Sequence, residues 1–109
     1  MDYVRVASVN DVSEGEIKPV EAGGQKLLLT KDGGEFHVTQ RKCPHMGLNL
    51  CKGKIEDGGI VCMFHKAKFD LKTGKVARDP KLLFIGMKAK NDLVIYPVKV
   101  EGEDILVGI

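Results

Sequence analysis

The sequence has no apolar run that approaches the roughly 18 residues needed for a membrane-spanning helix. Its opening stretch, MDYVRVASVND, lacks the basic and then apolar segments of a secretory signal peptide. Internal repeats, linkers and low-complexity tracts are missing as well. We therefore expect one globular domain with no membrane partner, located in the cytoplasm.

Cysteines and aromatic residues are few. Three cysteines in a reducing compartment argue against a disulfide framework and favour metal ligation instead. The six aromatic residues are scattered, and no recognition-helix pattern accompanies the basic residues. We therefore expect no nucleic-acid partner.

No window longer than about ten residues keeps a helical apolar repeat, and only VNDVSEG is compatible with a short helical turn. Short β-like runs with turn residues between them take the place of helices. These runs are YVRVASV, KLLLT, EFHVT, GGIVC, DLVIYPVKV and DILVGI. The sequence therefore predicts an all-β protein.

Turn residues organise these runs into hairpins. KDGG joins KLLLT to EFHVT, EGE joins the last two runs, and Pro97 places its strand at an edge or a bulge. We expect an antiparallel base domain of residues 1–40 and 82–109, closed by pairing of the two termini in one sheet. Residues 41–81 form an inserted, loop-rich unit.

The net charge of +2 is unevenly distributed. Residues 41–81 hold ten basic and four acidic residues, a net charge of +6, whereas the rest of the chain carries −4. A solvated lysine-rich loop surface explains this pattern as well as a docking surface for an acidic partner does.

Four side chains of the inserted unit form a candidate metal site: Cys43, His45, Cys62 and His65. They occur as a Cys-x-His pair and a Cys-x-x-His pair separated by sixteen residues. That separation is long enough for a strand–turn–strand excursion, KIEDGGIVC, that returns the second pair to the first.

Three kinds of site use such residues. Structural zinc takes two cysteines and two histidines, but usually as a Cys pair followed by a His pair. A cysteine nucleophile needs only one Cys–His pair. A [2Fe–2S] cluster in which two histidines replace two cysteines on one iron matches both the number and the types of residue. The residues favour this cluster and leave zinc as an alternative.

The segment CPHMGLNLCKGKIEDGGIVCMFHKAKFDLKTGKV resembles the cluster-binding region of Rieske proteins. The resemblance rests on Cys-Pro-His-x-Gly-x-x-Leu, the glycine before the second pair, Cys-x-x-His, and Phe-Asp-x-x-Thr-Gly. It implies that Cys43 and Cys62 bind one iron of a single [2Fe–2S] cluster, and that His45 and His65 bind the other.

For the fold, the resemblance implies a Rieske-like antiparallel β-sandwich or partial barrel with three small sheets. The cluster-binding subdomain is inserted in it, with the histidine edges facing solvent. Pro80 stands where the family has a loop that covers the cluster.

The resemblance also bears on the reduction potential. High-potential members of the family carry Ser and Tyr hydroxyls near the cluster sulfurs, at positions where this chain has Ala67 and Phe69. We therefore predict a potential near the low end of the Rieske range, about −150 mV. An apolar jacket around the ligands is also expected, formed by Met46, Leu48, Met63, Phe64 and Phe69.

The leading functional hypothesis is a monomeric one-electron carrier, not an enzyme. It would take electrons from a flavoprotein reductase and pass them to a terminal oxygenase or a similar enzyme, through an acidic docking face on the partner. A 2-His-1-carboxylate iron site is excluded, because only His37 remains beyond the candidate ligands. The alternative is a small Rieske subunit or accessory module of a larger reductase, similar to that of nitrite reductase.

Two residues of types that often ligate metals remain outside this hypothesis. Cys51 fits no ligand position and is expected to be a spare buried thiol. His37 alternates with Phe36 and Val38, so we expect it to face solvent without a function.

Overall fold

The computed structural model describes residues 2–42, 53–62, 66–78, 81–82, 85–86 and 92–109. Within these residues the chain forms strands and one short 3-10 helix, η1 (Val9–Asp11). The first seven strands are β1 (Tyr3–Ser8), β2 (Ile17–Ala22), β3 (Gln25–Asp32), β4 (Glu35–Gln40), β5 (Lys54–Glu56), β6 (Gly59–Val61) and β7 (Lys68–Asp70). The remaining strands are β8 (Val76–Arg78), β9 (Lys81–Leu82), β10 (Ile85–Gly86), β11 (Ile95–Tyr96), β12 (Val98–Glu101) and β13 (Asp104–Gly108).

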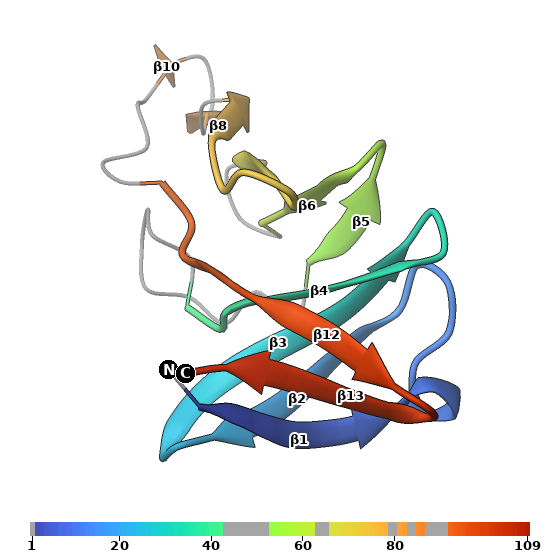
Figure 1. The fold of residues 1–109 in the computed structure, drawn as a ribbon. Helices are drawn as coiled ribbons and strands as arrows, with labels where there is room; N and C mark the ends of the chain where they lie inside the picture. Colours follow the sequence, from blue (N-terminus) through green and yellow to red (C-terminus); the bar gives the residue numbers. More distant parts are fainter. Residues whose placement is uncertain (1, 43–52, 63–65, 79–80, 83–84, 87–91) are drawn as a thin grey trace.

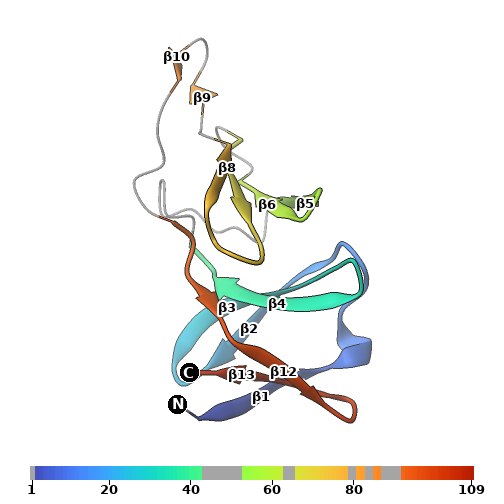
Figure 2. The ribbon, with the colours of Figure 1, turned by 45° about the horizontal axis from the view of Figure 1, so that its top comes forward.

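These strands form three main antiparallel sheets in layers (Figure 1). A three-stranded sheet has the order β1-β13-β12, and a four-stranded sheet has the order β11-β4-β3-β2. A second four-stranded sheet, β5-β6-β7-β8, lies beyond the first, and a two-stranded hairpin of β9 and β10 lies furthest from the termini (Figure 2). The predicted all-β, antiparallel fold is confirmed.

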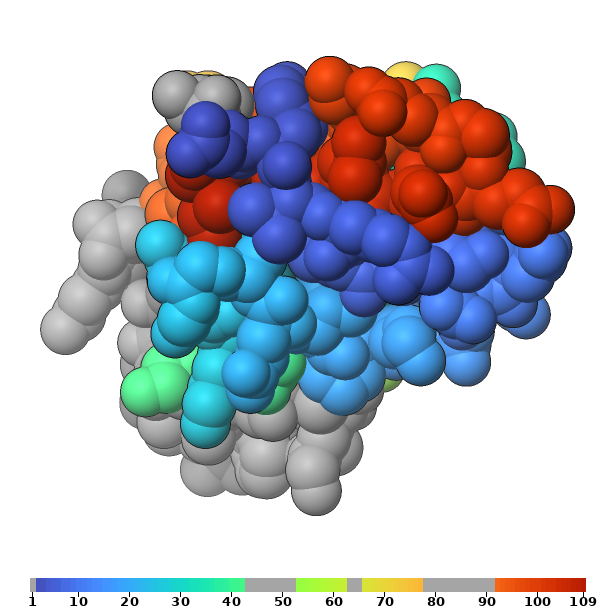
Figure 3. All heavy atoms as spheres, turned by 60° about the horizontal axis from the view of Figure 1, so that its bottom comes forward, coloured from blue at the N-terminus to red at the C-terminus, as the bar shows by residue number. Residues whose placement is uncertain are grey.

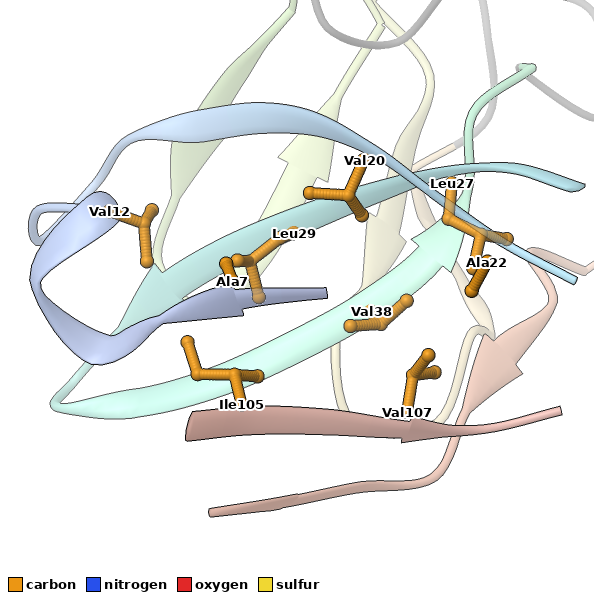
Figure 4. Close-up of a cluster of buried hydrophobic side chains, with 9 residues drawn as sticks. All are labelled: Ala7, Val12, Val20, Ala22, Leu27, Leu29, Val38, Ile105 and Val107. Carbon is orange, nitrogen blue, oxygen red and sulfur yellow. The ribbon is translucent and has the colours of Figure 1, made fainter. Parts of the chain in front are cut away.

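The first core lies between the three-stranded sheet and the middle sheet (Figure 4). Alternate residues of the strands point into it, as the two-residue repeat of a strand requires. Leu29 and Val38, for example, are register partners on β3 and β4, and both are fully buried. The core residues are Ala7, Val12, Val20, Ala22, Leu27, Leu29, Val38, Ile105 and Val107.

The second core lies on the opposite face of the middle sheet. Leu28 of β3 packs there with Ile60, Phe69 and Leu71 of the β5–β8 sheet and its turn. Each of these four side chains is 0% exposed, and burial of such a side chain contributes about 2 kcal/mol. This packing holds the β5–β8 sheet on the base of the molecule.

His37 lies on this second face, and the expectation that it faces solvent is wrong. The residue is only 9% exposed, although its neighbours Phe36 and Val38 alternate with it as expected for a strand. The alternation predicts two faces correctly but does not show that a second layer covers the other face. His37 is the register partner of Thr30, whose buried hydroxyl has no hydrogen-bond partner in the described part of the chain.

Local turn chemistry explains how the strands are connected. Gly33 and Gly34 have φ values of 62° and 80° and form the two-residue loop between β3 and β4, as KDGG predicts. The carboxylate of Glu14 accepts hydrogen bonds from both glycine N–H groups, at 2.6 and 3.0 Å. These two bonds lower the pKa of Glu14.

Both termini join the three-stranded sheet, as the sequence predicts. β1 pairs with β13, and the backbone N–H of Asp2 donates to the carbonyl of Ile109 at 3.3 Å. Figure 3 shows the dark blue N-terminal segment beside the red C-terminal segment on this side of the molecule. Pro97 separates β11, which pairs with β4, from β12, which pairs with β13, so the chain changes sheets at this residue.

Among the described residues, none belongs to a helix long and apolar enough to cross a membrane.

Candidate functional site

Cys62 directly follows β6 and stands at the start of a short loop that ends at Ala67, before β7. The backbone N–H of Cys62 donates to the carbonyl of Ala67 at 2.8 Å and closes this loop. Lys66 completes the reversal with a left-handed φ of 58°. Of the four predicted ligands only Cys62 lies within the described residues; Cys43, His45 and His65 lie outside them.

The described residues that pack with Cys62 are apolar, and its side chain is buried. Its exposed fraction is 2%, and it belongs to the second core together with Ala67 and Phe69, which are both 0% exposed. Neither of these two side chains carries a hydroxyl. Phe69, a predicted member of the apolar jacket, shares a buried core with Cys62, whereas the other predicted members, Met46, Leu48, Met63 and Phe64, lie outside the described residues.

This environment fits an iron–sulfur cluster. A thiolate is a soft ligand of the kind such clusters use. An apolar shell limits the access of water to the sulfur and thereby influences the potential of the bound group. The donor and its surroundings are therefore suited to hold the cluster that the resemblance implies.

The strand–turn–strand excursion before Cys62 is also confirmed. β5 and β6 are joined by Asp57 and Gly58, with φ values of 46° and 77°, so both residues have the positive φ of a tight hairpin turn. Cys43, to which this hairpin is expected to return Cys62, lies outside the described residues.

The Phe-Asp-x-x-Thr-Gly motif has a structural explanation in the turn after β7. The carboxylate of Asp70 accepts the backbone N–H groups of Lys72 and Thr73 at 2.8 and 3.0 Å. These bonds lower the pKa of Asp70. The backbone N–H of Gly74 donates to the Asp70 carbonyl at 2.8 Å and completes the turn.

Gly74 connects this turn to the returning chain. It has a φ of 77°, and its carbonyl accepts the N–H of Leu93 at 2.8 Å. A Cβ atom at this position would lie only 2.0 Å from the carbonyl oxygen of Leu93. The motif identifies this glycine in the sequence, but its contact with Leu93 is visible only in the fold.

Gln40 and Arg41 support the chain where it leaves β4 towards Cys43, and sequence reasoning missed this role. The Gln40 side chain donates to the carbonyl of Lys42 at 2.7 Å and accepts the N–H of Val94 at 2.8 Å. The guanidinium of Arg41 donates to the carbonyls of Val20 and Leu27, at 2.7 and 3.2 Å. No local sequence pattern predicts the bonds that join Gln40 to Val94 and Arg41 to Val20 and Leu27.

The chain is similar to proteins of known family in both sequence and structure. A family model described as Rieske [2Fe-2S] domain matches residues 2–85. The chain is 35% identical over 108 residues to the biphenyl dioxygenase ferredoxin subunit of Pseudomonas sp. (strain KKS102), covering 98% of this chain and 92% of that protein.

Two further similarities extend this comparison. The chain is 38% identical over 102 residues to apoptosis-inducing factor 3 of Homo sapiens, covering 94% of this chain but spanning only 16% of that protein's length. A solved structure of the complex of reduced oxygenase and oxidized ferredoxin in carbazole 1,9a-dioxygenase matches with a TM-score of 0.82 and 25% identity. That match covers 97% of this chain and 92% of the solved one.

Proposed function

Because the chain belongs to the Rieske [2Fe-2S] domain family, we propose that it is a ferredoxin-type carrier that moves one electron at a time. A relative of nearly the same length is named as the ferredoxin subunit of a dioxygenase, which supports this assignment. The observation that carries the proposal is the buried thiol of Cys62, placed in an apolar shell within the matched region.

The proposed ligands are Cys43 and Cys62 for one iron and His45 and His65 for the other. Two thiolates and two imidazoles are the ligand set of a Rieske [2Fe–2S] cluster. When bound, such a cluster accepts and releases a single electron. The closed loop from Cys62 to Ala67 supports the assignment, because it fixes the backbone on both sides of residues 63–65.

The potential is proposed to lie near the low end of the Rieske range, about −150 mV. The full burial of Ala67 and Phe69 beside Cys62 supports this value, since neither side chain can donate a hydrogen bond to a sulfur. A midpoint above about +100 mV would contradict it.

The proposed partners are a flavoprotein reductase as donor and a terminal oxygenase as acceptor, with an acidic docking face. The similar solved complex is one of an oxygenase with a ferredoxin, which supports the acceptor. The net charge of +6 in residues 41–81 supports an acidic face on the partner. A cytoplasmic monomer remains our prediction.

The alternative is a small Rieske subunit or accessory module of a larger reductase. The similarity to 16% of the length of apoptosis-inducing factor 3 favours this alternative, because there the matching stretch is a small part of a longer chain. Size-exclusion chromatography of native extract separates the two, since a permanent subunit elutes in a stable large complex and a diffusing carrier does not.

Metal analysis of matched variants tests the proposed ligands. After anaerobic reconstitution we expect two irons and two acid-labile sulfides in the wild type, as a [2Fe–2S] cluster requires. Cys62→Ser should lose them, and so should a double His45→Ala, His65→Ala variant. The same-type controls Cys51→Ser and His37→Gln should keep them. Full iron and sulfide content in Cys62→Ser would refute the assignment.

A further inference from the structure

Two lysines lie on the same face of the β5–β8 sheet, on the two strands that flank β6. Lys54 of β5 and Lys68 of β7 are both register partners of Val61 on β6, the central strand between them. The neighbouring row of partners, Ile55, Ile60 and Phe69, points into the second core. Because successive side chains of a strand point to opposite faces, Lys54 and Lys68 lie on the face turned away from that core.

This lysine pair lies at the Cys62 end of the sheet. Val61, between the two lysines, is the residue directly before Cys62, so the α-carbons of the two are about 3.8 Å apart. The acidic residues of the same face occupy the other end, because Glu56 and Asp70 are both register partners of Gly59. The outer face is therefore basic towards Cys62 and acidic away from it.

Lys54 and Lys68 differ in their ion pairs from two other lysines of residues 41–81. Lys72 lies 4.0 Å from a carboxylate oxygen of Glu35, and Lys75 lies 3.6 Å from one of Asp92. Within the described residues, by contrast, neither Lys54 nor Lys68 lies within ion-pair distance of a carboxylate. Their charges are thus available to a second molecule.

The side chain of Lys68 lies over Gly59 of the neighbouring strand. A Cβ atom on Gly59 would lie 2.6 Å from Cε and 3.0 Å from Cγ of Lys68. The missing side chain of Gly59 therefore leaves room for the methylene stem of Lys68, which is half-buried. A stem that already lies on the sheet loses less side-chain entropy when its ammonium group binds a partner.

We propose that Lys54 and Lys68 form the contact surface for an acidic face of the terminal oxygenase that accepts the electron. This inference rests on the proposed function and specifies which of the ten basic residues of the inserted unit take part. Carboxylates are the complementary chemistry, and the position beside Cys62 brings the partner next to the loop that carries this ligand.

The test compares two double variants with the same loss of charge. Lys54→Gln, Lys68→Gln removes the proposed contact, and Lys72→Gln, Lys75→Gln removes the two carboxylate-paired lysines. Adsorption to a carboxylate-terminated monolayer on gold is followed with a quartz-crystal microbalance at about 0.02 M salt, where charges are weakly screened. We expect the first variant to lose about tenfold in affinity and the second to stay within about twofold of wild type. The difference should disappear near 0.5 M salt.

Equal losses in both variants would overturn the proposal, because they would show an effect of net charge alone. The same ranking is expected for the rate at which reduced protein passes electrons to a terminal oxygenase, and equal rates would also overturn it. The proposed carrier function is read separately, from the voltammetric wave of the wild type on bare graphite. If that wave is absent, the carrier function fails while the adsorption measurement still decides the lysine surface.

Discussion

At the scale of single residues, Ala67 stands at the position where, by the family resemblance, high-potential Rieske proteins carry a serine hydroxyl. Its carbonyl already accepts the N–H of Cys62, and its side chain is fully buried in the same apolar shell. A serine there would add a hydroxyl donor to the buried cluster that contains Cys62, with a change of only one atom.

We therefore expect Ala67→Ser to raise the midpoint potential. One added hydrogen bond of about 1 kcal/mol corresponds to roughly 40 mV in a one-electron couple. Redox titration of the reconstituted protein measures the shift, with Ala67→Gly as the control that alters packing but adds no donor. An unchanged or lowered midpoint in Ala67→Ser would contradict the role assigned to this position.

His37 lies between the middle sheet and the β5–β8 sheet, with charges on both sides. Burial lowers the pKa of its imidazole below the ordinary value of 6.5, and Lys72 acts in the same direction. The carboxylates of Glu35, Asp32 and Asp70 oppose this shift without reversing it. The folded protein therefore favours neutral His37.

This shift predicts a loss of stability in mild acid. Below about pH 6.5 the unfolded chain binds a proton at His37 more readily than the folded chain does. The free energy of unfolding therefore decreases as the pH falls below this value. His37→Gln should show a weaker pH dependence below about pH 6.5. Urea unfolding of equally loaded wild type and variant measures the difference, and parallel pH curves would exclude the contribution.

His37 also shows where residue-level prediction fails. His37 and Val38 point to opposite faces of the middle sheet, as predicted. The face of His37 is buried because the β5–β8 sheet packs against it, and the sequence does not reveal this. The position of Phe69 in the same core as Cys62 is predictable, because it follows from the resemblance rather than from periodicity.

At the scale of elements, turns are the part of the fold that short-range chemistry determines most directly. The Asp-Gly pairs at Asp32–Gly33 and Asp57–Gly58 both occur at hairpin turns, as expected. β2 has no counterpart among the predicted strands, since IKPVEA contains a proline and charged residues. It is an edge strand, where a proline removes no bond from a second neighbour.

Gly74 is the turn residue whose replacement we expect to be most harmful. Gly74→Ala forces a side chain into φ = 77° and places its Cβ 2.0 Å from the Leu93 carbonyl oxygen. The left-handed conformation costs about 1–2 kcal/mol, and displacement of the Leu93 hydrogen bond adds about 1–3 kcal/mol.

Gly24→Ala is the matched control for this prediction. Gly24 has a φ of 76°, nearly the same as Gly74, but apart from its chain neighbours no described atom lies within 4 Å of the position that an added Cβ would take. Chemical unfolding should show a clearly larger loss for Gly74→Ala than for Gly24→Ala. Equal losses would mean that the contact with Leu93 contributes nothing.

At the scale of the whole molecule, one sheet contributes side chains to two hydrophobic cores. The middle sheet packs against the three-stranded sheet on one face and against the β5–β8 sheet on the other. Alternation along a strand cannot reveal this, because a strand buried on both faces has no regular polar positions. The layered arrangement follows from the family resemblance, and the hairpins alone do not predict it.

The molecule is elongated, 48 × 25 × 20 Å, with the chain ends and Cys62 in different layers. Two hydrogen bonds anchor the chain just before β11. The N–H of Val94 donates to the Gln40 side chain at the end of β4, and the N–H of Leu93 donates to the carbonyl of Gly74 in the turn after β7. These bonds join residues more than fifteen positions apart in the chain, which is why the sequence pattern does not reveal them.

The adjacent chain ends have a consequence for gene fusion. Asp2 and Ile109 exchange backbone hydrogen bonds in the layer furthest from the β9–β10 hairpin. A longer polypeptide could therefore host this fold as an insertion with two neighbouring junctions, and neither junction would lie in the β5–β8 sheet that carries the proposed contact lysines. The proposed electron carrier could thus be joined to another domain at both ends without a change in either core.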